Sequence, residues 1–195
     1  LIYRSPIFWT IPFFTVLFAE TTARGMGYLL AKAGVTINGQ SGGILPVLVF
    51  GAGTDYALLL VSRYREELRR HEDKHDAMAI ALQSAGPAIL ASGLTVIAAL
   101  LTLSIAEVNG TAGLGPIGAM GVALAMISML TMLPAALTIC GRNWFWPRIP
   151  HLGEAGVDAT HGFWRRIGDR VAVRPRAVWI IGSLVLAILA ANLLN

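Results

Sequence analysis

Charged residues are scarce in this chain of 195 residues: they make up only 13% of it, whereas hydrophobic residues make up 55%. A soluble domain of this length needs about 25% charged residues to cover its surface. The mean hydropathy of +0.66 is high for the same reason. The bilayer is therefore the expected solvent of the chain. No basic, aromatic-rich soluble surface is indicated, so we expect no nucleic-acid partner.

Cysteine is almost absent, since Cys140 is the single one. No disulfide framework can form within the chain, and no Cys/His pattern has the spacing of a metal site. His71 and His75 are four residues apart, but the sequence defines no third ligand beside them. Nucleotide-binding glycine loops and serine-nucleophile motifs are missing as well. We therefore expect no enzymatic activity, no metal and no organic cofactor.

Long apolar runs are what the sequence does contain. Five of them approach the roughly 20 residues that a helix needs to cross a bilayer. They cover residues 7–33, 43–62, 87–107, 114–140 and 177–194. Segments rich in turn-forming or charged residues separate them. The pattern predicts an all-α membrane protein, a multi-span helical bundle with about five spans. Because the chain starts at Leu1 and stops inside an apolar run, we expect it to be a fragment of a longer protein.

Basic residues predict which way the spans point. Thirteen of the 15 lysines and arginines lie before the first run, in residues 63–86 or in residues 141–176. Cytoplasmic loops of membrane proteins carry this excess of positive charge. We therefore expect residues 63–86 and 141–176 to be cytoplasmic, and the protein to lie in the bacterial inner (cell) membrane.

The two charged connections have different patterns. Residues 63–83 can be helical throughout. Residues 143–176 form a linker whose later part places Phe163, Trp164, Ile167 and Val171 on one helical face, away from the arginines. A strongly amphipathic helix of this kind lies in the membrane surface. The expected domains are a transmembrane bundle over 1–142, this cytoplasmic linker over 143–176, and a further span over 177–195.

One acidic residue, Asp55, stands in the middle of the second apolar run. It precedes Arg63 by eight residues, which corresponds to about 12 Å along a helix. A charged side chain in the hydrocarbon core costs at least about 2.5 kcal/mol. Such residues usually line ion or proton pathways, and a low-dielectric site favours the protonated carboxyl group. Hydrogen bonding between helices is the structural alternative.

Hydroxyl groups are expected near this acid. Tyr56 follows it directly, and Ser92 and Thr95 lie on one face of the next span at a similar depth. A carboxyl group, a phenol and two hydroxyls at one depth predict a proton relay, with the proton as the coupling ion. Gly51 and Gly53 should allow close approach of another helix, or of water, beside the relay.

A second intramembrane pair consists of Glu20 and Arg24, four residues apart in the first span. This spacing allows an ion pair, and we interpret it as structural. In the fourth span, the small residues Gly115, Gly118, Gly121 and Ala125 should allow close helix packing.

Several motifs resemble the MMPL family of the RND transporter superfamily. The main one is G-A-G-T-D-Y-A-L-L-L-V-S-R-Y-R-E-E-L-R-R over residues 51–70, followed by A-G-P-A-I-L-A-S-G-L-T-V over 85–96. The preceding N-G-Q-S-G-G-I-L over 38–45 and the L-P-A-A-L over 133–137 also fit. The similarity extends over nearly the whole chain.

The resemblance implies a twelve-span protein in two similar halves, of which this chain holds the third to seventh spans. It implies export of hydrophobic or lipid-like cargo driven by the proton-motive force. Asp55 would be the proton acceptor, Tyr56 its partner and Ser92 a supporting hydroxyl. The partners would be membrane lipids and the missing remainder of the transporter, with its second helical half and its extracytoplasmic domains. Two alternatives share the helix arrangement: a lipid- or sterol-sensing scaffold, and a protein-translocation motor of the SecDF type.

Overall fold

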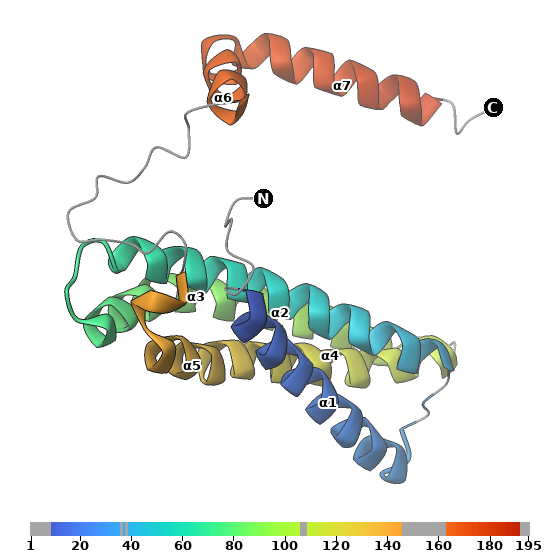
Figure 1. Ribbon diagram of the computed structural model, residues 1–195. Coiled ribbons are helices and arrows are strands. Elements are labelled where there is room, and N and C mark those ends of the chain that lie inside the picture. The colour runs from blue at the N-terminus through green and yellow to red at the C-terminus, as the bar shows by residue number, and fades with distance from the viewer. Residues whose placement is uncertain (1–8, 36, 38, 106–108, 146–162, 192–195) are drawn as a thin grey trace. The chain divides into compact units, whose positions relative to one another are not determined.

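The computed structural model of the chain describes residues 9–35, 37, 39–105, 109–145 and 163–191. All regular structure in this described part is helical, as the apolar runs predict (Figure 1). The chain divides into two compact units, residues 1–154 and 155–195. Each unit is described by itself.

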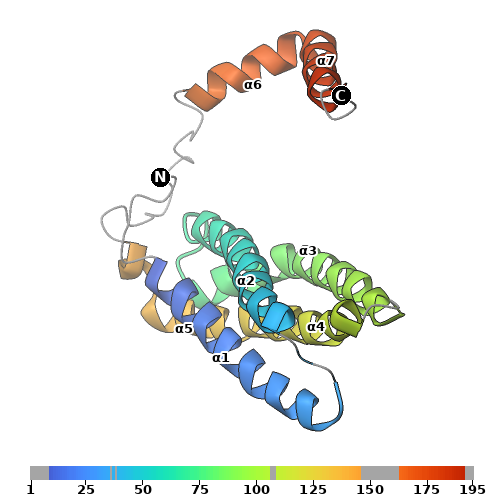
Figure 2. The ribbon, with the colours of Figure 1, turned by 90° about the vertical axis from the view of Figure 1, so that its right-hand side faces the viewer.

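The first unit is a helical bundle arranged around α4 (Figures 1 and 2). Its elements are α1 (Thr10–Lys32), α2 (Gly39–Glu67), α3 (Lys74–Thr102), the 3₁₀ turn η2 (Leu103–Ile105), α4 (Asn109–Leu130), α5 (Met132–Cys140) and the 3₁₀ turn η3 (Arg142–Phe145). Helix α4 packs against α1, α2 and α3, and α2 also packs against α3. The candidate site residues lie on α2 and α3.

Three helical segments among the described residues are long and apolar enough to cross a membrane: Ser41–Glu67, Lys74–Ile105 and Gly113–Cys140. They contain the second and fourth predicted spans and residues 87–105 of the third. Helix α1 has 23 residues but carries both Glu20 and Arg24. In the second unit, Pro175–Ile188 is a shorter apolar helix. Membrane crossing by these last two helices stays a prediction.

The connection between α2 and α3 is not helical throughout, so the prediction for residues 63–83 is wrong. Helix α2 ends at Glu67, and α3 begins only at Lys74. The side chain of Asp73 caps α3 by accepting a hydrogen bond of 2.7 Å from the backbone N–H of His75. Tyr64 and Leu68 are fully buried at the turn. Burial of these two side chains and the cap at Asp73 stabilise a turn that local helix propensity does not indicate.

The fourth predicted span is divided into α4 and α5 at Thr131. Pro134 lies four residues after Leu130 and has no N–H that could donate to the carbonyl oxygen of Leu130. The proline ring also clashes with this oxygen. The Thr131 hydroxyl donates a hydrogen bond of 2.7 Å to the carbonyl oxygen of Ile127. Helix α5 ends at Gly141, whose φ of 66° suits glycine.

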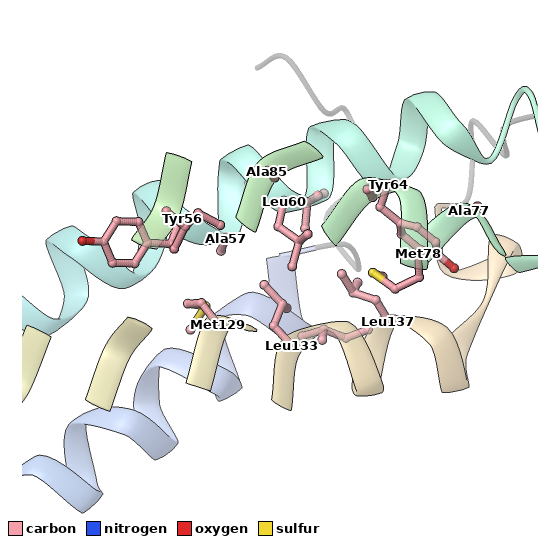
Figure 3. Close-up of a cluster of buried hydrophobic side chains, with 14 of the residues drawn as sticks. Tyr56, Ala57, Leu60, Tyr64, Ala77, Met78, Ala85, Met129, Leu133 and Leu137 are labelled. Carbon is pink, nitrogen blue, oxygen red and sulfur yellow. The ribbon is translucent and has the colours of Figure 1, made fainter. Parts of the chain in front are cut away.

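Two groups of buried side chains hold the bundle together. The larger group joins one face of α2 to α3, α4 and α5, as Figure 3 shows for Leu60, Ala85, Met129 and Leu133. The smaller group joins α1, α2 and α4 through side chains that include Ala19, Val49 and Ala125. Inside a bilayer, dispersion contacts of this kind rather than removal from water stabilise helix packing.

Small residues let α4 approach its neighbours, as the sequence predicts. A Cβ atom built at Gly115 would lie 2.7 Å from the carbonyl oxygen of Leu100. At Gly121 it would lie 2.5 Å from Leu45 Cδ1 and 2.9 Å from Val49 Cγ2. Gly118 and Ala125 are buried on the same helix. These positions exclude larger side chains at the present helix spacing.

The second unit contains α6 (Phe163–Val173) and α7 (Pro175–Ala191). The helix expected in the later part of the linker is therefore present as α6. The two helices run in clearly different directions: α6 is seen nearly end-on in Figure 1 and along its length in Figure 2, while α7 shows the reverse. The earlier part of the linker, residues 146–162, and the end of the last predicted span lie outside the described residues.

Candidate functional site

Asp55 lies in the middle of α2, on a face that the described part of the chain leaves exposed. The helix continues without a break from Gly39 to Glu67. The eight-residue separation from Arg63 therefore does correspond to about 12 Å of helix. Since the surrounding helical segment is long and apolar enough to cross a membrane, Asp55 has the character of an intramembrane acid.

Tyr56 points in a different direction from Asp55, because successive residues on a helix are about 100° apart. Only 5% of it is exposed, and it belongs to the larger buried group shown in Figure 3. Its hydroxyl oxygen lies 3.3 Å from the position that a Cβ atom would take at Gly93 of α3. The sulfur of Met126, from α4, lies 2.5 Å from the same position. Side chains of two helices, α2 and α4, therefore converge on Gly93 of α3.

Ser92 and Thr95 flank Gly93 on α3, so Tyr56 lies at their level along the bundle. Both hydroxyl residues are exposed, as Asp55 is. The Thr95 hydroxyl donates a hydrogen bond of 2.7 Å to the carbonyl oxygen of Ala91 within its own helix. Within the described residues, no hydrogen bond joins Asp55 to either hydroxyl. The structure thus brings Tyr56 to the level of both hydroxyls, but it does not bring Asp55 into contact with them.

The two glycines before Asp55 have different surroundings. A Cβ atom built at Gly53 would lie 2.9 Å from Cγ2 of Val16, so α1 and α2 approach each other there. Gly51 is exposed, and a Cβ atom built there would meet no atom within 4 Å. Within the described chain, another helix therefore approaches at Gly53, whereas Gly51 faces open space. Two residues correspond to about 200° of rotation, so Gly51 faces away from α1.

Glu20 and Arg24 of α1 form an ion pair through Oε1 and Nε. The carboxylate is buried, with 6% of its side chain exposed, whereas 62% of the arginine side chain is exposed. Glu20 lies one residue after Ala19, which belongs to the smaller buried group between α1, α2 and α4. Tyr56 belongs to the larger buried group instead.

Sequence reasoning missed two residues of this site, Gly93 and Met126. Gly93 carries a signal that could have revealed it, because a small residue between Ser92 and Thr95 suggests a close contact with another helix. Met126 has no such signal, since it is one of several apolar residues in α4 and only the packing of three helices selects it.

Known proteins resemble this chain over nearly its whole length. A sequence model described as the MMPL family matches residues 1–178. Putative membrane protein ActII-3 of Streptomyces coelicolor is 53% identical over 96% of this chain and 26% of its own length. An apo-petrobactin exporter of Bacillus anthracis is 35% identical over 98% of this chain and 28% of its own length.

A further relative, probable transport protein MmpL12 of Mycobacterium tuberculosis, is 33% identical over 98% of this chain and 16% of its own length. The chain thus spans less than a third of the length of each of these three relatives. No solved structure matches it. Together with the three apolar helical segments, these similarities establish a membrane protein.

Proposed function

Because the chain belongs to the MMPL family, we propose that it is part of a membrane exporter of hydrophobic or lipid-like molecules driven by the proton-motive force. The names of two relatives, an exporter and a probable transport protein, support transport as the activity. The intramembrane acid Asp55 supports protons as the coupling ion. In this function the protein moves its cargo without making or breaking covalent bonds in it.

In the proposed mechanism, Asp55 binds a proton from the outer side and releases it toward the cytoplasm. A carboxylate in an apolar span is costly, and protonation removes its charge. Protonation of Asp55 therefore changes the relative free energies of conformations that bury this residue and conformations that expose it. Its exposed face is free to meet the part of the transporter that lies beyond this chain.

Tyr56 is proposed to link this titration to helix packing, and its burial is the observation that carries the proposal. Its backbone is continuous with Asp55, while its ring lies between α2, α3 and α4 beside Gly93 and Met126. A change at Asp55 that rotates α2 must therefore move the ring against two other helices. Ser92 and Thr95 are proposed as supporting hydroxyls, since they lie at the same level on α3.

The test is export by the full-length transporter in membrane vesicles with an imposed proton gradient. Asp55→Asn keeps the size of the side chain and removes its titration, so export should fall to the background. Asp76→Asn is the matched control, because Asp76 is exposed in the first turn of α3 and outside the site. Tyr56→Phe keeps the ring and should cause a smaller loss of export.

Proton-dependent export that is unimpaired in Asp55→Asn would refute the relay. Absence of export by the unmodified full-length protein would instead favour a lipid-sensing scaffold, which needs no titrating group in the membrane. The full-length sequence offers a second check, since a two-half transporter should have another Asp-Tyr pair in the corresponding span of its other half.

A further inference from the structure

The junction between α6 and α7 concentrates positive charge. Residues 165–176 contain five arginines and only one acidic residue, Asp169. Arg170, Arg174 and Arg176 are all exposed. Within the described residues, none of these three forms an ion pair with a carboxylate. We call residues 169–176 the elbow.

The elbow joins two helices of very different character. Residues 168–188 are all exposed within the described chain. The apolar side chains of α7 include Trp179 at 72% exposed and Ile181 at 64%. Such a helix needs an apolar environment, which the membrane supplies. Since α6 runs in a clearly different direction (Figures 1 and 2), a spanning α7 would place α6 along the membrane surface and the elbow among the lipid headgroups.

The elbow also has a suitable shape for a headgroup. Asp169, Arg170, Val173 and Arg174 line an open groove of about 500 Å³. The backbone N–H of Arg174 donates to the carbonyl oxygen of Arg170 at 3.2 Å, so the two arginines lie one helical turn apart. Their guanidinium groups and the apolar surface of Val173 therefore face one groove. This combination matches a molecule with an anionic head and an apolar tail.

We propose that the elbow binds anionic phospholipids of the adjacent leaflet through their phosphate groups. Guanidinium groups form paired hydrogen bonds with phosphate oxygens, and clusters of arginine next to a membrane helix are attracted to acidic lipids. Arg63 and Arg70 provide a contrast within the same protein. Both are exposed, but Arg63 forms an ion pair with Glu66 and Arg70 forms ion pairs with Glu66 and Glu67, so two carboxylates compensate their charge. The proposal does not depend on the proton relay.

The test uses the full-length transporter in detergent, mixed with phosphatidylglycerol or with phosphatidylcholine. Native mass spectrometry then measures how much of each lipid the protein retains. Arg170→Gln/Arg174→Gln should weaken retention of phosphatidylglycerol roughly tenfold, because each arginine near the headgroups contributes a severalfold gain in affinity. Retention of phosphatidylcholine should stay the same.

Arg63→Gln/Arg70→Gln removes the same number of positive charges and should leave retention of both lipids unchanged. Asp169→Asn removes the acidic side chain that the described lining of the groove contains, and it should strengthen binding of phosphatidylglycerol. This gain keeps the test decisive if the double variant of the elbow fails to fold. Equal losses in both double variants, or full retention in Arg170→Gln/Arg174→Gln, would overturn the proposal. The latter result would leave an acidic protein partner as the alternative occupant of the elbow.

Discussion

Replacement of Gly53 by alanine tests the closest approach between α1 and α2. The added Cβ atom would lie 2.9 Å from Cγ2 of Val16, 3.4 Å from its Cγ1 and 3.7 Å from its Cβ. Carbon atoms in ordinary contact are about 3.5–4.0 Å apart. Because both methyl groups of Val16 face the site, rotation of its side chain offers little relief. The two helices must therefore separate.

The expected cost follows from two opposing effects. Overpacking of a well-packed site costs about 1–3 kcal/mol. Alanine stabilises the interior of a helix by up to about 1 kcal/mol relative to glycine, because its helix propensity is higher. The net loss for Gly53→Ala should be about 1–2 kcal/mol, which lowers the apparent melting temperature of the full-length protein in detergent.

The chain offers a matched control two residues away on the same helix. Gly51→Ala adds the same methyl group where no atom lies within 4 Å, so it should not lower the melting temperature. Val16→Ala/Gly53→Ala should recover part of the loss, since the double change removes the methyl groups that clash. If Gly53→Ala and Gly51→Ala are equally stable, α1 and α2 do not meet at Gly53 and the packing described above is wrong.

Three further substitutions test other parts of the bundle. Asp73→Ala removes the cap of α3 and should cost about 1 kcal/mol, seen as faster hydrogen exchange in the first turn of that helix. Arg142→Gln removes a guanidinium group that donates a hydrogen bond of 2.8 Å to the carbonyl oxygen of Glu72, in the turn between α2 and α3. Amide hydrogen exchange in residues 68–73 should become faster, and an unchanged exchange rate would contradict this contact. Leu60→Ala should lower the free energy of unfolding by about 2–5 kcal/mol, measured by thermal unfolding, since Leu60 is fully buried. Leu58→Ala should lower it clearly less, because Leu58 is 42% exposed.

Much of the helical architecture could be predicted because its causes are local. The second and fourth apolar runs lie within α2 and the α4–α5 segment, and α3 covers the third run as far as Thr102, since a bilayer requires the backbone to satisfy its own hydrogen bonds. The spacing of small residues in the fourth run also predicted the close approach of α4, at Gly115 and Gly121. Helix ends were harder to predict, since α3 begins well before the apolar run that it contains.

The candidate site could be predicted only in part. An acid in an apolar run is visible in the sequence, so Asp55 was found without a structure. The sequence does not reveal which of Gly51 and Gly53 meets another helix, because the neighbour of each depends on where α1 crosses α2. Likewise, the turn after Glu67 depends on buried contacts of Tyr64 and Leu68 that no local pattern reveals.

Local patterns in the sequence are enough to identify a helical membrane protein with a lone acid in its second predicted span and a basic, amphipathic helix late in the chain. Hydropathy, charge and helical period are properties of neighbouring residues, and they suffice for these conclusions. The inward orientation of Tyr56 toward Gly93 and Met126, and the exposed position of Asp55, become visible in the packed bundle alone. That division depends on which helices pack together and in what register, and contacts between residues far apart in the chain set both.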